Sequence, residues 1–143
     1  MGINTFEQEL RKIVSPSYPD ATYVGRACYV RLSEMNRAKI QFISTHIASQ
    51  YDALRLTILN RDEGAVDNLV LRFSDLFGKK HTSNPNFRNG IIPYIWDDYG
   101  NIAWYVYQPS NRDYQDLSDA VGSYLDVFLE QAQTEGPQWE QTM

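Results

Sequence analysis

Apolar and polar residues alternate in several short runs of this chain, and this pattern constrains the fold more than any other feature. In the clearest run, Leu54, Leu56 and Ile58 alternate with Arg55 and Thr57. Because successive side chains of a strand point to opposite sides, the run predicts a strand with one buried face. Four such runs cover residues 24–32, 39–47, 53–59 and 66–73. Their short connections predict an antiparallel meander that is covered on one side.

The first run is expected to be one uninterrupted strand. Its inner face would carry Val24, Cys28, Val30 and Leu32. The third and fourth runs are joined by residues 60–64, where Asn and Gly tolerate the backbone angles of a tight turn. These two runs therefore predict a hairpin.

An amphipathic helix is expected near the N-terminus. Phe6, Leu10 and Ile13 recur at helical spacing, Thr5 can cap the segment, and Pro16 ends it. The apolar stripe of such a short helix predicts that it packs on the sheet.

A longer helix is expected near the C-terminus, with Ser110 as its N-cap and Asp113 as the partner in a capping box. Its apolar stripe consists of Tyr114, Leu117, Val121, Tyr124 and Phe128. Its opposite, acidic face is expected to carry Asp116, Asp119, Asp126 and Glu130. One side of this helix should therefore pack, and the other should be nearly all carboxylate.

The segment between the meander and this helix predicts a helical turn at 74–78, a basic loop at 79–90, and a hairpin. The hairpin pairs residues 91–96 with 102–107 around a turn at 97–100. Together the elements predict one α+β domain over residues 1–132 and a flexible tail over 133–143. The domain would hold a single antiparallel sheet of about six strands, with the N-terminal and C-terminal helices packed on one face.

Acidic residues are concentrated at the end of the 143-residue chain, whose formal net charge is −5. Residues 1–96 hold 12 basic and 9 acidic side chains, whereas residues 97–143 hold nine acidic ones and a single basic one, Arg112. Such a block repels phosphates and attracts a basic protein surface. The expected partner-binding residues are Asp97, Asp98, Asp113, Asp116, Asp119, Asp126 and Glu130.

Catalytic and metal sites find little support in the sequence. Cys28, His46 and His81 do not form the close pairs that structural zinc sites use. Cys28 lies within an apolar strand, which raises the pKa of its thiol and makes it inert. Phosphate-binding glycine motifs and the Gly-x-Ser-x-Gly elbow are missing. The sequence therefore predicts a protein that is not an enzyme and needs no metal or cofactor. A metal-dependent enzyme, in which Cys28, His46, His81 and an Asp converge on a metal, is the third hypothesis.

Nucleic-acid binding is the alternative that the sequence leaves open. Lys79, Lys80 and Arg88 place basic groups near Phe87 in the loop. Aromatic residues that could stack on bases are Tyr29, Trp104, Tyr105 and Tyr107. Against this, the isoelectric point of about 4.9 argues against direct contact with nucleic acid.

The cellular compartment is expected to be the cytoplasm. The chain has no run of about 18 apolar residues and no secretory signal at its start. Its single cysteine rules out an internal disulfide and fits a reducing environment.

A resemblance to known proteins is carried by five stretches, residues 4–13, 25–29, 59–64, 83–90 and 93–96. These stretches resemble small proteins carried by conjugative and phage-like mobile elements of gut Firmicutes. Such elements carry antirestriction and anti-CRISPR proteins, which are commonly small, acidic and non-enzymatic. The resemblance and the acidic C-terminal segment together predict an inhibitor of a host defence nuclease, first of all an anti-CRISPR protein that binds an RNA-guided type II Cas effector. An accessory protein that binds nucleic acid through the 79–90 loop is the alternative.

Overall fold

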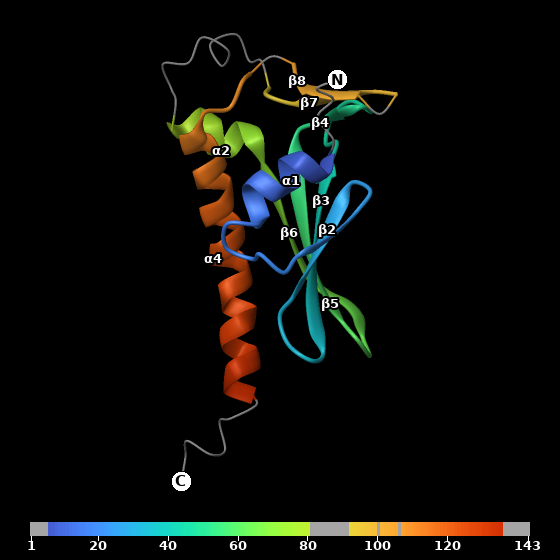
Figure 1. The fold of residues 1–143 in the computed structure, drawn as a ribbon, viewed down its shortest axis with the longest axis vertical. Coiled ribbons are helices and arrows are strands. Elements are labelled where there is room, and N and C mark those ends of the chain that lie inside the picture. The colour runs from blue at the N-terminus through green and yellow to red at the C-terminus, as the bar shows by residue number, and fades with distance from the viewer. Residues whose placement is uncertain (1–5, 81–91, 100, 106, 136–143) are drawn as a thin grey trace.

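The computed structural model describes residues 6–80, 92–99, 101–105 and 107–135. It contains a short N-terminal helix, a helix in the middle of the chain and a long C-terminal helix (Figure 1). They are α1 (Phe6–Val14), α2 (Phe73–Lys80) and α4 (Asn111–Glu135). None of the helices within these ranges is both long enough and apolar enough to cross a membrane.

The strands form two antiparallel sheets, so the α+β class is confirmed. The main sheet has the order β1 (Thr22–Val24), β2 (Ala27–Arg31), β3 (Asn36–Ile43), β5 (Ala53–Asn60) and β6 (Gly64–Arg72). The small sheet has the order β4 (Gln50–Tyr51), β7 (Ile95–Asp98) and β8 (Asn101–Trp104). The prediction of a single sheet of about six strands is therefore wrong in detail: the described strands form one sheet of five strands and a second sheet of three. The C-terminal hairpin pairs with the short strand β4 instead of with the meander, because β7 meets Gln50 and Tyr51 in register.

The run at 24–32 is not one strand but a tight hairpin. Val24 pairs with Ala27 across a two-residue turn, and Gly25 takes a positive φ of +60°. Glycine adopts this conformation without steric cost, and hairpin turns of this length require it. The turn moves Val24 out of the predicted inner face, so its side chain is 65% exposed.

The other runs form strands with the predicted alternation, but the strand expected at 39–47 lies at Asn36–Ile43. Ile40 lies opposite Leu56, and Leu56 lies opposite Leu69, in the register of β3, β5 and β6. The predicted turn at 60–64 joins β5 to β6, and Gly64 takes a φ of +80° there. The last run ends one residue early, because Phe73 starts α2 and is buried against Phe77 and Trp104.

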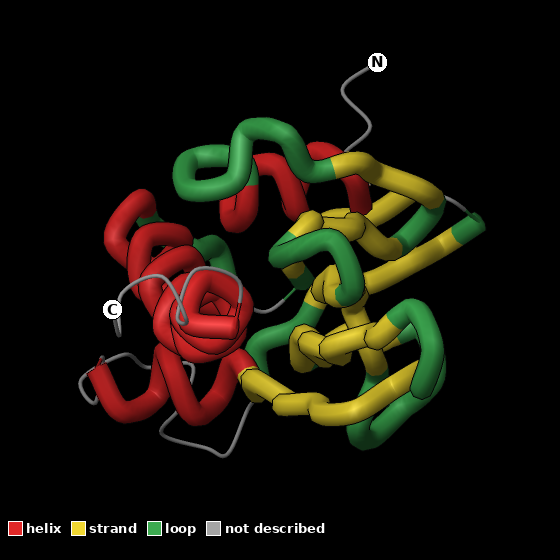
Figure 2. The backbone as a smooth tube through the Cα atoms, turned by 90° about the horizontal axis from the view of Figure 1, so that it is seen from below, coloured by secondary structure: helices red, strands yellow, loops and turns green. Residues whose placement is uncertain are grey.

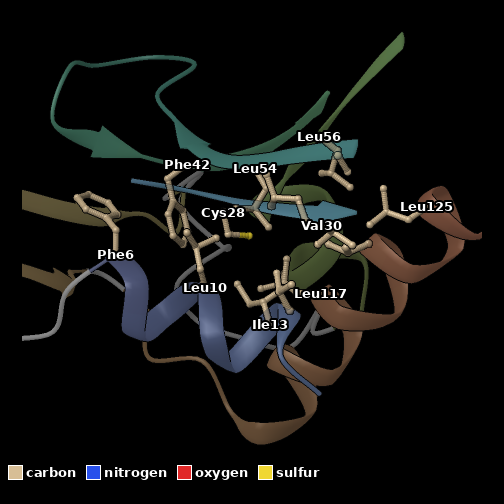
Figure 3. Close-up of a cluster of buried hydrophobic side chains, with 14 of the residues drawn as sticks. Phe6, Leu10, Ile13, Cys28, Val30, Phe42, Leu54, Leu56, Leu117 and Leu125 are labelled. Atoms are coloured by element: carbon tan, nitrogen blue, oxygen red, sulfur yellow. The ribbon is translucent and has the colours of Figure 1, made fainter. Parts of the chain in front are cut away.

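The core lies between the main sheet and the helices α1 and α4. The helices gather on one side of the molecule and the strands on the other (Figure 2). Leu10 of α1 and Leu117 of α4 point toward Cys28 and Leu54 of the sheet (Figure 3). These four side chains are fully buried, and burying an aliphatic side chain of this size contributes about 1.5–3 kcal/mol. One face of the sheet is therefore closed by helices, as the sequence predicts.

The start of α4 also matches the prediction. Asp113 N–H donates to Ser110 Oγ at 3.2 Å, and Ser110 N–H donates to Asp113 Oδ2 at 2.9 Å. This reciprocal pair is the expected capping box, which satisfies backbone donors at a helix start.

Candidate functional site

Two of the predicted partner-binding carboxylates are buried. Asp113 is 0% exposed, and its Oδ2 accepts a hydrogen bond of 2.6 Å from the Tyr107 hydroxyl in addition to the capping bond. Asp116 is 6% exposed and lies 3.6 Å from Arg112. The prediction that Asp116 belongs to an exposed acidic face is therefore wrong. The side of α4 that carries Asp116 is covered, whereas Arg112, Gln115 and Asp119 in the same turns are exposed.

The remaining carboxylates of α4 form a thinner acidic surface than predicted. Asp119 and Asp126 are exposed, and Asp119 accepts a hydrogen bond of 2.9 Å from Gln115 Nε2. The two are seven positions apart, which corresponds to about 10 Å along a helix. Glu130 lies on the same helix, but its side chain is outside the described part of the structure.

The adjacent carboxylates of β7 have different surroundings. Asp97 accepts a hydrogen bond of 2.9 Å from Arg26 Nη2, and only 10% of its side chain is exposed. This ion pair ties the small sheet to the β1–β2 turn. Asp98, one residue later, is exposed. Of the two predicted binding residues, Asp98 is the accessible one.

An exposed group of aromatic side chains lies beside Asp98 on the outer face of the small sheet. We call Tyr94, Trp96 and Tyr105 the aromatic patch. The ring of Tyr94 stacks on that of Tyr105 with centroids 5.5 Å apart, and Trp96 lies 6.2 Å from Tyr105. Trp96 is 37% and Tyr105 68% exposed. Large aromatic side chains in a contiguous exposed group mark surfaces that bind other proteins.

The other aromatic residues considered for base stacking are divided between core and surface. Trp104 packs on Phe73 with centroids 5.1 Å apart, and Tyr107 packs on Phe77 at 5.2 Å. Both belong to the core cluster or to its edge. Tyr29 points to the uncovered side of the main sheet.

The candidate metal ligands do not come together in the described residues, where no group of three or more His, Cys, Asp or Glu side chains has the arrangement of a metal site. Cys28 is fully buried, and burial raises the pKa of its thiol to about 12, as an inert cysteine requires. His81 and Arg88 lie outside the described residues, as do the side chains of Lys79 and Lys80 at the end of α2.

His46 instead contacts a buried carboxylate. Its Nδ1 lies 2.7 Å from Asp52 Oδ2, while the backbone N–H and the hydroxyl of Thr45 donate to the two oxygens of Asp52 at 2.8 and 2.5 Å. Burial alone would raise the pKa of Asp52, but these hydrogen bonds and His46 hold it below its usual value. The group fastens the loop between β3 and β5, and we assign it a structural role.

A second buried carboxylate connects three elements. Glu9 of α1 is 2% exposed and accepts hydrogen bonds from Trp104 Nε1 at 3.1 Å and from the Tyr114 hydroxyl at 2.7 Å. Its other oxygen lies 3.2 Å from Lys12 Nζ. Burial and the neighbouring Glu9 raise the pKa of Tyr114. Since Glu9 is held by donors on β8, α4 and its own helix, the cluster joins the helix layer to the small sheet.

One surface is not evident from the sequence alone. No described helix or strand covers most of the side of the main sheet that faces away from α1 and α4, although Ala27 and Ala53 on this side are buried. This side carries Tyr29 and five basic residues. We call this surface the open face; it consists of Tyr29, Arg31, Arg37, Lys39, Arg55 and Arg72. Alternation alone placed Arg55 and Lys39 outward. Only the register between the strands shows that all these residues share one surface.

No family model, curated protein or solved structure matches this chain.

Proposed function

We propose that this protein is a non-enzymatic inhibitor that acts by binding a host defence nuclease, with an RNA-guided type II Cas effector as the first partner to test. The aromatic patch carries the proposal of a protein partner. Exposed Trp and Tyr side chains are the residue types that contribute most to protein interfaces, since they bury a large area at a low cost in side-chain entropy.

Exposed carboxylates, one beside the patch and two on α4, support a basic partner. Asp98 is exposed beside Trp96, and Asp119 and Asp126 add negative charge on α4. Nucleases that hold nucleic acid present basic channels, and opposite charges speed association and make it sensitive to salt. The resemblance to small proteins of mobile elements supports the choice of a defence nuclease within this class.

The test is a pull-down of the tagged protein with guide-loaded and empty type II Cas nuclease, at low and high salt, together with a target-cleavage assay. We expect capture and loss of cleavage. Trp96→Ala and Tyr105→Ala should each weaken capture by at least tenfold, because truncating an interface hot spot costs about 2 kcal/mol or more. Val127→Ser, which changes an exposed apolar residue on α4, is the matched control and should leave capture unchanged.

A second pair of variants separates the aromatic patch from the acidic helix. Asp119→Asn combined with Asp126→Asn should lower the association rate and its salt dependence but retain capture, because exposed charges act mainly on the encounter. Capture that is absent for the wild type, or equal for Trp96→Ala and wild type, would contradict the proposal.

A further inference from the structure

We propose that the open face is a binding surface for single-stranded nucleic acid. This surface lies on the main sheet and does not include the aromatic patch. The inference goes beyond nuclease inhibition and does not depend on it. It also revises the expectation, drawn from the isoelectric point, that direct contact with nucleic acid is absent.

The first observation is that charge is sorted between the two sides of the sheet. The five strands contain five basic residues, and all of them point to the open face. The same strands contain one acidic residue, Asp67, which points to the helix side and accepts a hydrogen bond of 2.9 Å from the Tyr124 hydroxyl of α4. The open face therefore presents cationic side chains from four neighbouring strands and no carboxylate from any strand.

The second observation is that the arrangement is unfavourable for the protein alone. Arg31 of β2 lies directly opposite Arg37 of β3. Like charges at directly opposite positions destabilise a sheet, and opposite charges stabilise it. If the surface served only solubility, a pair of opposite charges at these positions would make the sheet more stable. An anionic ligand removes the repulsion, so the pairing is expected where phosphates bind.

The third observation is a groove at the end of this face, beside the β2–β3 and β5–β6 turns. It has a volume of about 580 Å³, and its lining includes Tyr29, Arg31, Arg37 and Arg61. The Arg37 guanidinium lies 4.9 Å from the centre of the Tyr29 ring. An aromatic ring beside guanidinium groups is the combination that holds a base by stacking and its phosphate by paired hydrogen bonds.

The groove is not wholly basic, because Asp20 and Glu34 also line it. These carboxylates lie in the loops that flank the strands, whereas the arginines Arg31 and Arg37 lie on the strands themselves. The basic surface continues beyond the groove along β3 and β5, through Lys39 and Arg55. A ligand that follows the sheet therefore moves away from the two carboxylates.

The negative net charge of the protein does not prevent the open face from binding nucleic acid. Asp119 and Asp126 are on α4, which covers the opposite side of the sheet (Figures 2 and 3). Packed layers lie about 10 Å apart, and the Debye length at 0.15 M salt is about 8 Å. The charges of the helix layer are therefore largely screened at the open face, where the local charge determines binding.

The test is fluorescence anisotropy with fluorescein-labelled oligothymidylate and oligouridylate of about 16 nucleotides, the upper site size of a small single-strand binding fold. If the five basic residues each contact one phosphate, the logarithm of the affinity should fall with the logarithm of salt concentration with a slope of about −3.5. Arg55→Gln should weaken binding about fourfold at 0.15 M salt. Arg37→Gln combined with Arg55→Gln should weaken it more than tenfold and reduce the slope by about 1.4.

The matched control is Arg11→Gln, which removes one exposed positive charge from α1 and should leave oligonucleotide binding unchanged. Thermal melting by circular dichroism should show that all variants fold, since the altered side chains are exposed. Failure of both oligonucleotides to bind at about 0.05 M salt, or equal loss with Arg11→Gln, overturns the proposal. Tighter binding to phosphatidylserine vesicles than to either oligonucleotide, with the same dependence on Arg37 and Arg55, overturns it in favour of a membrane surface.

The two proposals can fail separately. Trp96→Ala should leave oligonucleotide binding intact, and the double variant at Arg37 and Arg55 should leave capture of empty Cas nuclease intact. Capture lost together with oligonucleotide binding in the double variant would show that both activities use the open face, which contradicts the separate role of the aromatic patch.

Discussion

The two faces of the main sheet are made from alternate residues of the same strands, yet they differ in burial and in charge. On the helix side, Ile40 and Leu56 are fully buried. Their chain neighbours Lys39 and Arg55 stand on the open face, where Arg55 is exposed. The comparison shows that one strand can serve two purposes, because its period of two places successive residues in unrelated environments. Changes on one face should affect stability, and changes on the other should affect binding.

The largest expected effect is on the helix side of β5. Leu56→Ala should lower the free energy of unfolding by about 2–5 kcal/mol, because it removes buried methyl groups and leaves a cavity. Arg55→Ala, one residue away, should change it by no more than about 0.5 kcal/mol. Urea denaturation followed by circular dichroism measures both. A cost of more than about 2 kcal/mol for Arg55→Ala would mean that the open face is covered in solution, and the comparison would break.

A smaller effect on the free energy of unfolding is expected within the helix layer, where the removal of a buried charge can be compared with the removal of an exposed one. Glu9→Ala should lower the free energy of unfolding by about 2 kcal/mol, because the half-buried donors Trp104 Nε1 and the Tyr114 hydroxyl lose the buried carboxylate that accepts from both. Glu7→Ala, two residues earlier, removes an ion pair with Arg11 whose two side chains are about half exposed. Such pairs contribute less than about 1 kcal/mol. Equal costs in urea denaturation would show that the Glu9 cluster does not connect α1 to the small sheet.

The smallest effect is expected at the junction of the two sheets and depends on pH. Since the pKa of Asp52 is lowered in the fold, its carboxylate stabilises the protein above the unfolded value of about 3.9. This contribution is lost as the pH falls through the lower, folded pKa. Unfolding measured between about pH 2 and pH 5 should show a shallower acid dependence for Asp52→Asn. Thr45→Val removes one hydrogen-bond donor to Asp52, so the loss of stability should begin at a higher pH. If stability depended on pH in the same way in both variants and in the wild type, Asp52 would not have the structural role assigned to it.

The sequence predicted those parts of the fold that depend on local patterns. The stripe from Phe6 to Ile13 formed α1, the 60–64 turn joined β5 to β6, and Ser110 with Asp113 formed the capping box. Each of these features is decided within a few residues, by hydrophobic spacing or by a short polar contact.

The features that were missed depend on contacts between distant segments. Alternation is the same on both sides of the Gly25 turn, so the pattern at 24–32 did not reveal two strands. The two-residue strand β4 has too few residues to show a period, and its pairing with β7 separated the small sheet from the main one. The burial of Asp116 depends on what packs beside α4, which a helical wheel does not include.

The candidate surfaces were predictable to a similarly limited extent. The charge count identified the acidic C-terminal segment, but it did not distinguish Asp113 inside the molecule from Asp119 outside it. The open face could be found only by adding the register of β2, β3, β5 and β6 to the alternation within each strand. The direction of a side chain follows from the local sequence of its strand, whereas its neighbours across the sheet depend on how distant segments pair.

The burial of Cys28 at the centre of the sheet has a practical consequence for studying these surfaces. It is the single thiol of the chain, it is fully enclosed between α1 and the strands, and its raised pKa keeps it protonated at neutral pH. A cysteine introduced on the open face or on α4 can therefore carry a fluorophore or spin label without first removing the native one. The native thiol, in turn, reports when the helix layer separates from the sheet, since a reagent reaches it only through that opening.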